Sequence, residues 1–531
     1  MPYFVKKKIN GKKYLYIAWA KRIGSKSKVI RQLYVGNAQR VAEILQSPLP
    51  KFTSHSYGEL ALLLHIAELS GFAEIVDKRL RKTAGIGNYL FLPVINRLIA
   101  PRSKAGLKEW YDKTCLPLIW DNKLSLSSQN YWYYLNRLTD EHMETIWQGI
   151  TKNIREKLQI TDSTFLFDPT NFFTYIEDHD GNVLPRKGHN KQMRHDKNQL
   201  AVSLFIGEAS QMPYDFNTYP GNTNDGKHFS SILPELGKKA SIWNKEKITL
   251  VIDKGNNSKE NLAALKDYYF VGSLSKVKTE VQDLLDAELK PCYVNANGNA
   301  IRSASAEMEI YGISCRAVVS FNEALRKKQL HSLDANIAKT MGKFETLKNR
   351  AFRSEGAATL AVVVILPRKN NPFDFVVKKE GNKFTVSITL DEDKVENYRK
   401  NAGKNVIFTN HLDWDDERII RTYRSMHKIE NQFKLLHGLL LIPMKPVFHW
   451  TDQKIKAHIF LCMVALLFAK TLEYACKGKI KGSFRQILDS AAAIRIALVH
   501  RDGQPKLVFE DLTLEQQELM EAFRLSRFAK N

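Results

Sequence analysis

The chain has 531 residues and an ordinary hydrophobic content of 44%, with 80 Lys and Arg against 56 Asp and Glu, so its net charge is +24. Its length allows roughly two to four domains with substantial cores. The cationic excess favours a polyanionic partner, with nucleic acid as the first candidate. A generally basic protein without such a partner is the alternative interpretation.

Several classes of protein are disfavoured at this stage. The five cysteines are widely spaced and form no CxxC pair, which argues against a disulfide framework or a zinc ribbon and suits a reducing cytoplasm. The N-terminus lacks the apolar run of a signal peptide. The longest apolar run, residues 459–469, is shorter than a bilayer requires and predicts a buried helix, so we expect no membrane association. Neither a Walker A nor a GxGxxG loop is present, so we expect no nucleotide cofactor.

Residues 1–50 predict a small basic β unit. Asn10-Gly11 separates two strand-like runs, which is a strong hairpin signal. Residues 1–42 contain eleven Lys or Arg and no acid. We expect this unit to bind DNA, with a purely structural role as the alternative, and the candidate contacts are Lys6, Lys7, Lys8, Lys12 and Lys13.

The rest of the chain predicts a mixed α/β protein. Residues 51–160 show helical spacing and predict a region for DNA binding or dimerisation. Strand-like runs then predict a core over 161–275, and residues 276–405 read as an insertion with a lysine-rich helix and further strands, including 357–367. The core resumes over 406–475, and 476–531 predict a polar helical tail.

Three carboxylates stand in unexpected places. Asp168 lies in or at the end of an apolar strand-like run, Asp253 ends another, and Glu430 falls on the apolar stripe of a helix predicted over 417–438. Each aspartate alone is explained equally well by a turn. Two strands of one sheet and one helix can, however, bring three carboxylates to one edge, where they need cations to stay ionised. Hard divalent ions, Mg²⁺ first, are the natural partners of such oxygen ligands.

In these residues the sequence resembles the DDE transposases of bacterial insertion sequences, in the group whose RNase H-like core is interrupted by a β-rich insertion. The resemblance rests on "FLFDPTNFFTY", "YPGNTNDGKHF" (219–229), "LVIDKG", a Tyr-x2-Arg-x3-Glu-x6-Lys pattern around Glu430, and "PVFHWT" (446–451). It covers nearly the whole chain. The aspartates are 85 residues apart, and Glu430 follows Asp253 by 177 residues, which fits an insertion between them.

The resemblance implies a function and a set of site residues. It implies a cytoplasmic, nucleoid-associated bacterial enzyme that cuts double-stranded DNA at terminal inverted repeats and joins the freed 3′-hydroxyl to target DNA, as a homodimer on DNA. Asp168, Asp253 and Glu430 would hold two Mg²⁺ ions, for which Mn²⁺ can substitute. Tyr423 would be the signature tyrosine and a DNA contact. The alternatives are an RNase H-like nuclease without strand transfer and a DNA-binding protein derived from a transposase.

Two positions depart from the pattern. Met426 stands where the pattern has Arg, and His437 stands where it has Lys. In the family these cations grip DNA near the cut end, so the grip is in doubt here although the metal site is not. Arg424 and Lys434 lie close enough to substitute in part, and His437 itself is a candidate phosphate contact.

Overall fold

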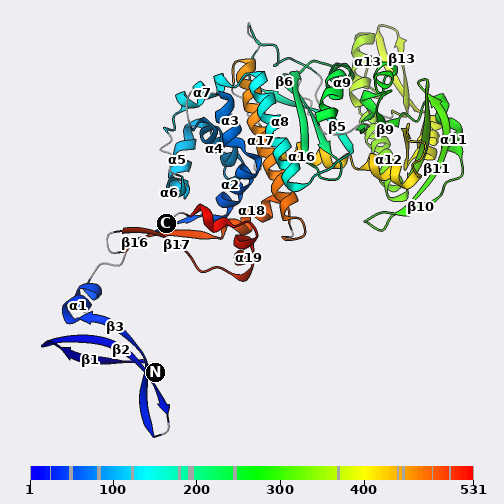
Figure 1. Cartoon of the computed structure of the whole chain (residues 1–531). Coiled ribbons are helices and arrows are strands. Elements are labelled where there is room, and N and C mark those ends of the chain that lie inside the picture. Colours follow the sequence, from blue (N-terminus) through cyan, green and yellow to red (C-terminus); the bar gives the residue numbers. More distant parts are fainter. Residues whose placement is uncertain are drawn as a thin grey trace. The chain divides into compact units, whose positions relative to one another are not determined.

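A computed structural model of the chain describes residues 2–23, 25–46, 52–80, 85–120, 125–177, 181–188, 196–242, 248–367, 371–438, 442–444, 449–480, 482–501 and 504–529. The chain forms two compact units (Figure 1). One contains Met1–Gly58 together with Ala492–Asn531, and the other contains Glu59–Ala491.

The first unit contains two small antiparallel sheets. The predicted hairpin is confirmed: β1 (Pro2–Ile9) pairs with β2 (Lys12–Ile23), and β2 pairs with β3 (Lys26–Asn37). Asn10 and Gly11 have φ of 49° and 80°, the left-handed conformation that a two-residue hairpin turn requires. The helix α1 (Ala38–Gln46) follows β3.

The second sheet of this unit corrects the predicted helical tail. It joins β4 (Phe52–Ser56), β16 (Arg495–Arg501) and β17 (Gln504–Phe509) in the order β17-β16-β4. Helix is present only on either side, in α18 (Phe484–Ala492), α19 (Leu514–Ala522) and the 3-10 turn Leu525–Phe528. The strand state of β16 depends on pairing with β4 from the opposite end of the chain, and local spacing contains no trace of such a partner.

The second unit contains the mixed sheet that was predicted for the core. Strands β5 (Thr164–Thr174), β6 (Asn198–Gly207) and β7 (Pro213–Pro220) are antiparallel neighbours, while β8 (Thr249–Ile252) and β9 (Tyr269–Leu274) run parallel to β5. Their spatial order is β7-β6-β5-β8-β9. The fold class is therefore α/β with a mixed sheet, as predicted.

Part of the insertion extends this sheet instead of forming a separate body. In the described residues the sheet continues past β9 with β15 (Lys404–Thr409), β12 (Ile313–Asn322), β11 (Ala300–Ile310) and β10 (Lys290–Val294), all antiparallel. The edge of β9 is thereby covered, and the insertion is anchored to the strand that follows Asp253.

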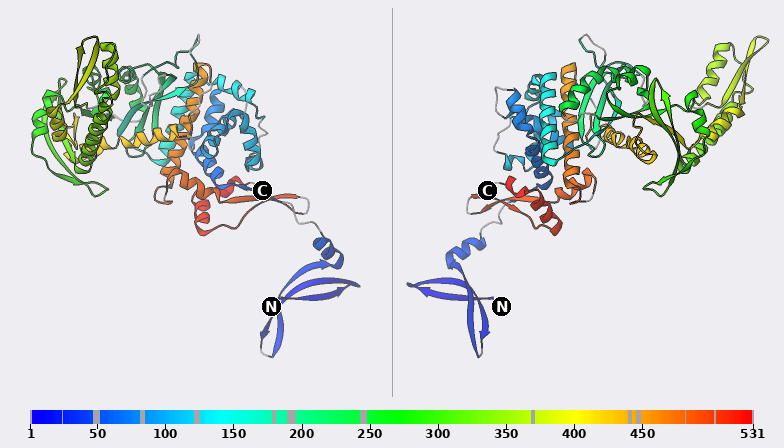
Figure 2. Two further views of the ribbon diagram at one scale, coloured as in Figure 1. Left: turned by 180° about the vertical axis from the view of Figure 1, so that it is seen from behind. Right: turned by 45° about the vertical axis from the view of Figure 1, so that its right-hand side comes forward.

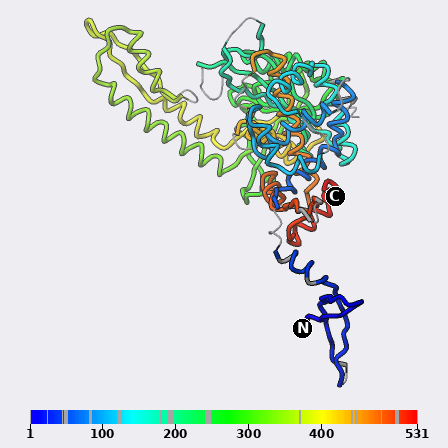
Figure 3. The backbone as a smooth tube through the Cα atoms, turned by 90° about the vertical axis from the view of Figure 1, so that its left-hand side faces the viewer, coloured from blue at the N-terminus to red at the C-terminus, as the bar shows by residue number. Residues whose placement is uncertain are grey.

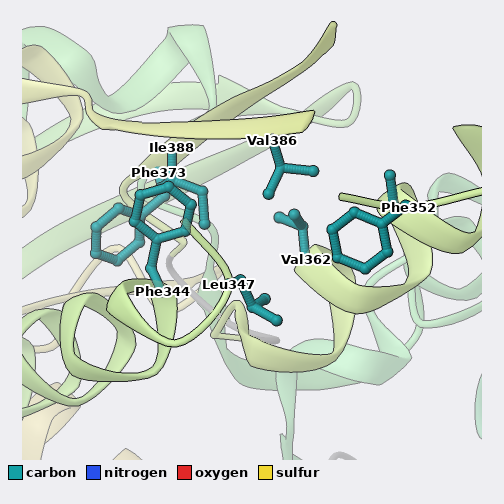
Figure 4. Close-up of a cluster of buried hydrophobic side chains, with 8 residues drawn as sticks. Phe344, Leu347, Phe352, Val362, Phe373, Val386 and Ile388 are labelled. Atoms are coloured by element: carbon teal, nitrogen blue, oxygen red, sulfur yellow. The ribbon is translucent and has the colours of Figure 1, made fainter. Parts of the chain in front are cut away.

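The remainder of the insertion forms a small module with its own core, seen extending from the sheet in Figure 3. It consists of α12 (Glu323–Glu345), α13 (Glu355–Ile365), the hairpin β13 (Phe373–Glu380) and β14 (Lys383–Leu390), and α14 (Glu392–Asn401). Phe344, Leu347, Val362 and Phe373 are among the buried residues of this core (Figure 4). Residues 357–367 were predicted as a strand, and this prediction is wrong because they lie almost entirely in α13, whose Ala358 and Val362 pack on the hairpin.

Helices complete the second unit. The predicted helical region contains α2 (Gly58–Ser70), α3 (Phe72–Leu80), α4 (Ile86–Ile99), α5 (Leu107–Lys113), α6 (Leu116–Ile119), α7 (Ser128–Arg137) and α8 (Asp140–Leu158). The core adds α9 (Asp225–Ile242), α10 (Lys259–Ala264), α11 (Gln282–Asp286), α15 (Asp416–Arg424) and α16 (His427–His437).

The apolar run at 459–469 lies in α17 (Asp452–Cys476), which contacts α4, α8 and β7. By length and composition alone α17 could cross a membrane, but 83% of its apolar window is buried inside the structure. It is therefore a core helix, as predicted.

Candidate active site

The two predicted aspartates lie next to each other on the core sheet, at the point where β8 ends. Strands β5 and β8 run parallel, and Phe167 pairs with Ile252 in their register. Asp168 is the next residue within β5, and Asp253 is the first residue after β8, so the register places them side by side at the point where β8 ends. Asp168 is half-buried and Asp253 is exposed.

Asp253 also occupies a turn, the alternative considered from sequence. It is the N-cap residue of the 3-10 turn Lys254–Asn256, but its side chain makes no capping hydrogen bond. The turn is closed instead by the backbone, where Asn256 N–H donates to the Asp253 carbonyl over 3.0 Å. The Asp253 carboxylate therefore makes no capping hydrogen bond to the turn that Asp253 begins.

The helix predicted over 417–438 is two helices, and this changes the placement of Glu430. The helix is interrupted at Ser425 and Met426, between α15 and α16, so the set of residues that faces the sheet changes between the two helices. The buried positions of α16 are Ile429, Gln432, Phe433 and Leu436. Glu430 lies next to this stripe and is exposed, so the expectation that it faces inward is wrong.

Contacts at both ends hold α16 along β5 (Figure 2). Near its start, Lys428 forms an ion pair with Glu208, whose N–H donates to the Thr164 carbonyl at the beginning of β5 over 2.8 Å. At its end, His437 Nε2 lies 3.1 Å from Thr170 Oγ1. Glu430 lies between these two contacts, two residues after Lys428 and seven residues before His437.

Tyr423, on α15, connects this helix pair to Asp253. Its hydroxyl lies 2.8 Å from Ser273 Oγ on β9 and 3.4 Å from Asp253 Oδ1. Burial raises the pKa of Tyr423 to about 12, with the charges of Asp253 and Glu430 adding to the rise and the Ser273 hydrogen bond opposing it. Both carboxylates therefore act on one phenol, which consequently stays protonated at physiological pH.

The donor chemistry of the three acids suits a hard divalent cation, since they offer only carboxylate oxygens. No ion pair among the described residues uses Asp253 or Glu430, so neither carboxylate is neutralised by a lysine or arginine there. The side chains are not gathered, however: within the same described ranges no three His, Cys, Asp or Glu side chains are placed to hold a metal ion.

Sequence reasoning gave no role to the residues that frame these acids. Tyr219 stacks on His228 with 3.5 Å between ring centres, and its hydroxyl lies 3.3 Å from Asp225 Oδ1. Burial raises the pKa of Tyr219, and the charges of Asp225 and Asp168 add to the rise. Tyr219, Asp225 and His228 fall in "YPGNTNDGKHF", which was recognised as a motif, so the signal was present without a geometry to interpret it.

A buried amide ties this motif to the loop after Asp253. Asn261 Nδ2 donates to the Gly226 carbonyl over 3.2 Å and to the Asn256 carbonyl over 2.9 Å. The loops beyond β7 and β8 are thereby fixed to each other, although only spatial proximity, not sequence spacing, indicates this role.

The predicted DNA-contacting residues are distributed over both units. Arg424 Nη1 donates to the Tyr293 hydroxyl over 3.2 Å, and exposed Lys434 donates to Asn431 Oδ1 over 2.9 Å. His437 stacks on Phe172 with ring centres 4.2 Å apart. Lys6, Lys7, Lys8, Lys12 and Lys13 are exposed on the first hairpin, in the other unit. Residues 445–448, which include the start of "PVFHWT", lie outside the described residues. Contacts of these residues with DNA remain predictions.

Comparison with known proteins gives a distant structural likeness. No family model matches the chain, and no curated protein sequence matches it. Among solved structures it is similar to a piggyBac transposase synaptic complex with hairpin DNA, determined by cryo-electron microscopy. The TM-score is 0.39 and the identity 9%, over 82% of this chain and 79% of that chain. At this level the likeness assigns no activity.

Proposed function

We propose that the chain is a DDE-type DNA transposase that cuts at the ends of an insertion sequence and joins the freed 3′-hydroxyl to target DNA. Asp168, Asp253 and Glu430 would hold two Mg²⁺ ions, with Mn²⁺ as a substitute. Such ions activate a water or hydroxyl nucleophile and stabilise the leaving oxygen of a phosphodiester. Because two transposon ends must be paired, the working form would be a homodimer on double-stranded DNA, in the bacterial cytoplasm.

The observation that carries the proposal is the register of β5 and β8. It makes Asp168 and Asp253 neighbours at the end of β8 although they are 85 residues apart in sequence. The helix that contains Glu430 runs along β5. The negative charges of Asp253 and Glu430 both contribute to the raised pKa of Tyr423. The same topology with acids at these positions supports phosphodiester chemistry better than it supports a purely structural sheet.

The protein's own groups have separable tasks in this proposal. Tyr423, held by Ser273, positions the Asp253 carboxylate. The Lys428–Glu208 ion pair and the 2.6 Å hydrogen bond from Gln432 Nε2 to the Gln211 carbonyl fix the approach of α16 to the sheet. The lysines of the first hairpin would contact backbone phosphates, which provide affinity without sequence preference.

A second candidate is a DNA-binding protein derived from a transposase. Met426 and His437 favour it, because they replace both signature cations, and His437 is engaged with Phe172 and Thr170. An RNase H-like nuclease that cuts without strand transfer is the competing enzyme. Terminal inverted repeats flanking the gene would support the transposase over both.

The test is nicking of a terminal-repeat duplex in Mg²⁺ and in excess chelator. We expect Asp168→Asn, Asp253→Asn and Glu430→Gln each to lower the rate by roughly a thousandfold or more while the proteins stay folded, since each removes a ligand that stabilises transition-state charge. Asp267→Asn, an exposed acid beyond the same turn, should keep the wild-type rate. Wild-type nicking in chelator would contradict the proposal.

A further inference from the structure

A group of cationic side chains converges on one tryptophan away from the carboxylates. Lys104 Nζ lies 3.1 Å from the ring centre of Trp132, and Lys454 Nζ lies 4.6 Å from it. The His449 ring meets Trp132 edge-on, with ring centres 5.0 Å apart. We call Lys104, Trp132, His449 and Lys454 the lysine–tryptophan cluster. Lys104 lies in the 3-10 turn Lys104–Gly106, Trp132 in α7 and Lys454 in the first turn of α17, while His449 lies just before α17. The helices α7 and α17 contact each other (Figure 1).

The charges in the cluster have the same sign. Burial and the nearby Lys454 ammonium lower the pKa of Lys104 to about 8. Burial lowers the pKa of His449 to about 3, and the three charges that add to this effect belong to Lys104, Arg97 and Lys454. Gathering cations in a partly desolvated place is unfavourable unless an anion joins them.

The acids close in sequence have other partners. The Asp452 carboxylate accepts from the backbone N–H groups of Val183 and Leu184, over 2.7 and 3.2 Å. Asp112 is paired with Lys108. In the part of the chain that the structure describes, no ion pair includes Lys104 or Lys454.

Two buried nitrogen atoms beside these lysines lack a partner. His449 is only 3% exposed, and its Nδ1 has no hydrogen-bond partner among the described residues. The same holds for Arg97 Nε, although Arg97 Nη1 donates to the Pro443 carbonyl. A buried nitrogen that can donate but has no acceptor is rare in folded proteins and is explained when a ligand supplies the acceptor.

We propose that the lysine–tryptophan cluster binds a phosphate group, supplied by the backbone of double-stranded DNA. A phosphate carries negative charge and several acceptor oxygens. It would therefore neutralise the clustered cations and accept hydrogen bonds from the unpartnered nitrogen atoms. Packing on Trp132 by itself would account for one lysine, since a cation over an indole face is favourable, but a second ammonium at the same ring adds repulsion. This inference rests on the DNA-binding part of the proposed function and is independent of the carboxylates.

Binding of the full-length protein to a labelled mixed-sequence duplex, measured over a salt series, tests the proposal. Lys104→Gln and Lys454→Gln should each weaken binding about fivefold, as expected for one charge-assisted contact. The double variant Lys104→Gln/Lys454→Gln should lower the slope of log affinity against log salt by up to about 0.9, because the two lysines neutralise one phosphate, and each single variant should lower it by less. Lys108→Gln, from the same segment, removes an exposed lysine that is already paired with Asp112, and should behave as the wild type.

Two further measurements separate the outcomes. If duplex binding is unchanged but inorganic phosphate raises the melting temperature of the wild type and not of the double variant, at equal ionic strength, the site takes free phosphate and the assignment to DNA is overturned. If neither effect is seen, the lysines only pack on Trp132 and the proposal is overturned. If the glutamine variants do not fold, amine acylation of the wild type decides: the duplex should protect Lys104 and Lys454, and equal acylation with and without duplex contradicts the site.

Failure of this proposal is distinguishable from failure of the proposed activity. Asp253→Asn should abolish nicking without changing the salt slope, because it touches no cation of the cluster. If the protein binds DNA through the cluster but never nicks it, the proposed enzymatic activity is refuted and the proposed phosphate site is supported.

Discussion

Tyr423 joins α15 to Asp253 and to Ser273 on β9 through its phenol hydroxyl. Its hydroxyl is shared between Ser273 and Asp253 and is protonated at physiological pH, since its pKa is about 12. It can therefore orient a carboxylate but not exchange a proton with DNA. In the proposed enzyme it is a positioning residue.

Tyr423→Phe should therefore lower kcat for nicking about tenfold with little change in KM, as expected from removing about 1 kcal/mol of positioning hydrogen bond. Ser273→Ala should reproduce the effect in part, because it frees the same hydroxyl. Tyr133→Phe changes an exposed tyrosine and serves as the control. A change in KM alone would argue that Tyr423 contacts DNA directly.

His228 makes stability depend on pH. Burial lowers the pKa of His228 to about 4, and its Nε2 lies 2.8 Å from Ser203 Oγ. The unfolded chain binds a proton near pH 6.5 and the folded chain does not, so the stabilisation is full above pH 6.5 and is lost as pH falls towards 4.

His228→Gln, which can keep a hydrogen bond to Ser203, should remove roughly 2–3 kcal/mol of this acid-induced loss. Urea unfolding of the second unit between pH 7 and 4 measures it, with His427→Gln as the exposed control. Equal pH dependence of wild type and His228→Gln would show that His228 is protonated in the folded protein.

At the scale of elements, prediction succeeded where the local pattern decides the structure. The runs over β5, β6, β8 and β9 are apolar and bounded by turn residues, and Asn10-Gly11 fixes its own hairpin. It failed where packing decides. The "AATLAVVVI" run is rich in strand formers, yet Ser354 caps it and one face packs on a hairpin, so it is helical.

The same reasoning explains the error at Glu430. One continuous helix would place it inward, but the break at Ser425 and Met426 shifts the phase so that Ile429 takes the buried position. No proline or glycine marks that break in the sequence. Both aspartates were found because a carboxylate next to a run of apolar residues is visible locally, although Asp253 follows the end of its strand whereas Asp168 lies within β5. The facing of Glu430 required the tertiary structure.

The module built on α12, α13 and the β13–β14 hairpin should unfold locally. Phe373 is 2% exposed and lies in its core. Phe373→Ala should cost about 3–5 kcal/mol of local stability. Hydrogen exchange should then rise over residues 355–390 and stay unchanged in β5 and β8. Val376→Ala, on the same strand but 53% exposed, is the matched control. An equal rise in β5 would show that the module and the sheet unfold as one.

At the scale of the whole molecule, sequence predicted the class of fold and not the way in which distant segments meet. The core order could be anticipated from the resemblance, but the pairing of β4 with β16 joins opposite ends of the chain, and the insertion strands extend the core sheet. Non-local pairings of this kind leave no periodic signal, which is why the tail was predicted as helix.

The charge distribution over the molecule leads to a prediction for the first unit. Lys6, Lys8, Lys12 and Lys13 are exposed on one hairpin, and Lys8 lies directly opposite Lys13 in its register. Like charges placed opposite each other destabilise a hairpin, so an anionic partner would relieve a cost that the isolated sheet carries. We therefore expect these lysines to contact DNA phosphates.

Changing all four to Gln should weaken binding to a mixed-sequence duplex and lower the salt slope by up to about 0.9 for each phosphate that the variant no longer neutralises. Net charge alone is controlled by a second variant, in which Lys108, Lys113, Lys152 and Lys238 become Gln. These lysines are exposed and already paired with acids in the other unit. Since the net charge falls equally in both variants, a difference in slope locates the phosphate-binding lysines on the hairpin. Equal slopes would mean that long-range attraction by the net charge, and not this hairpin, accounts for the affinity.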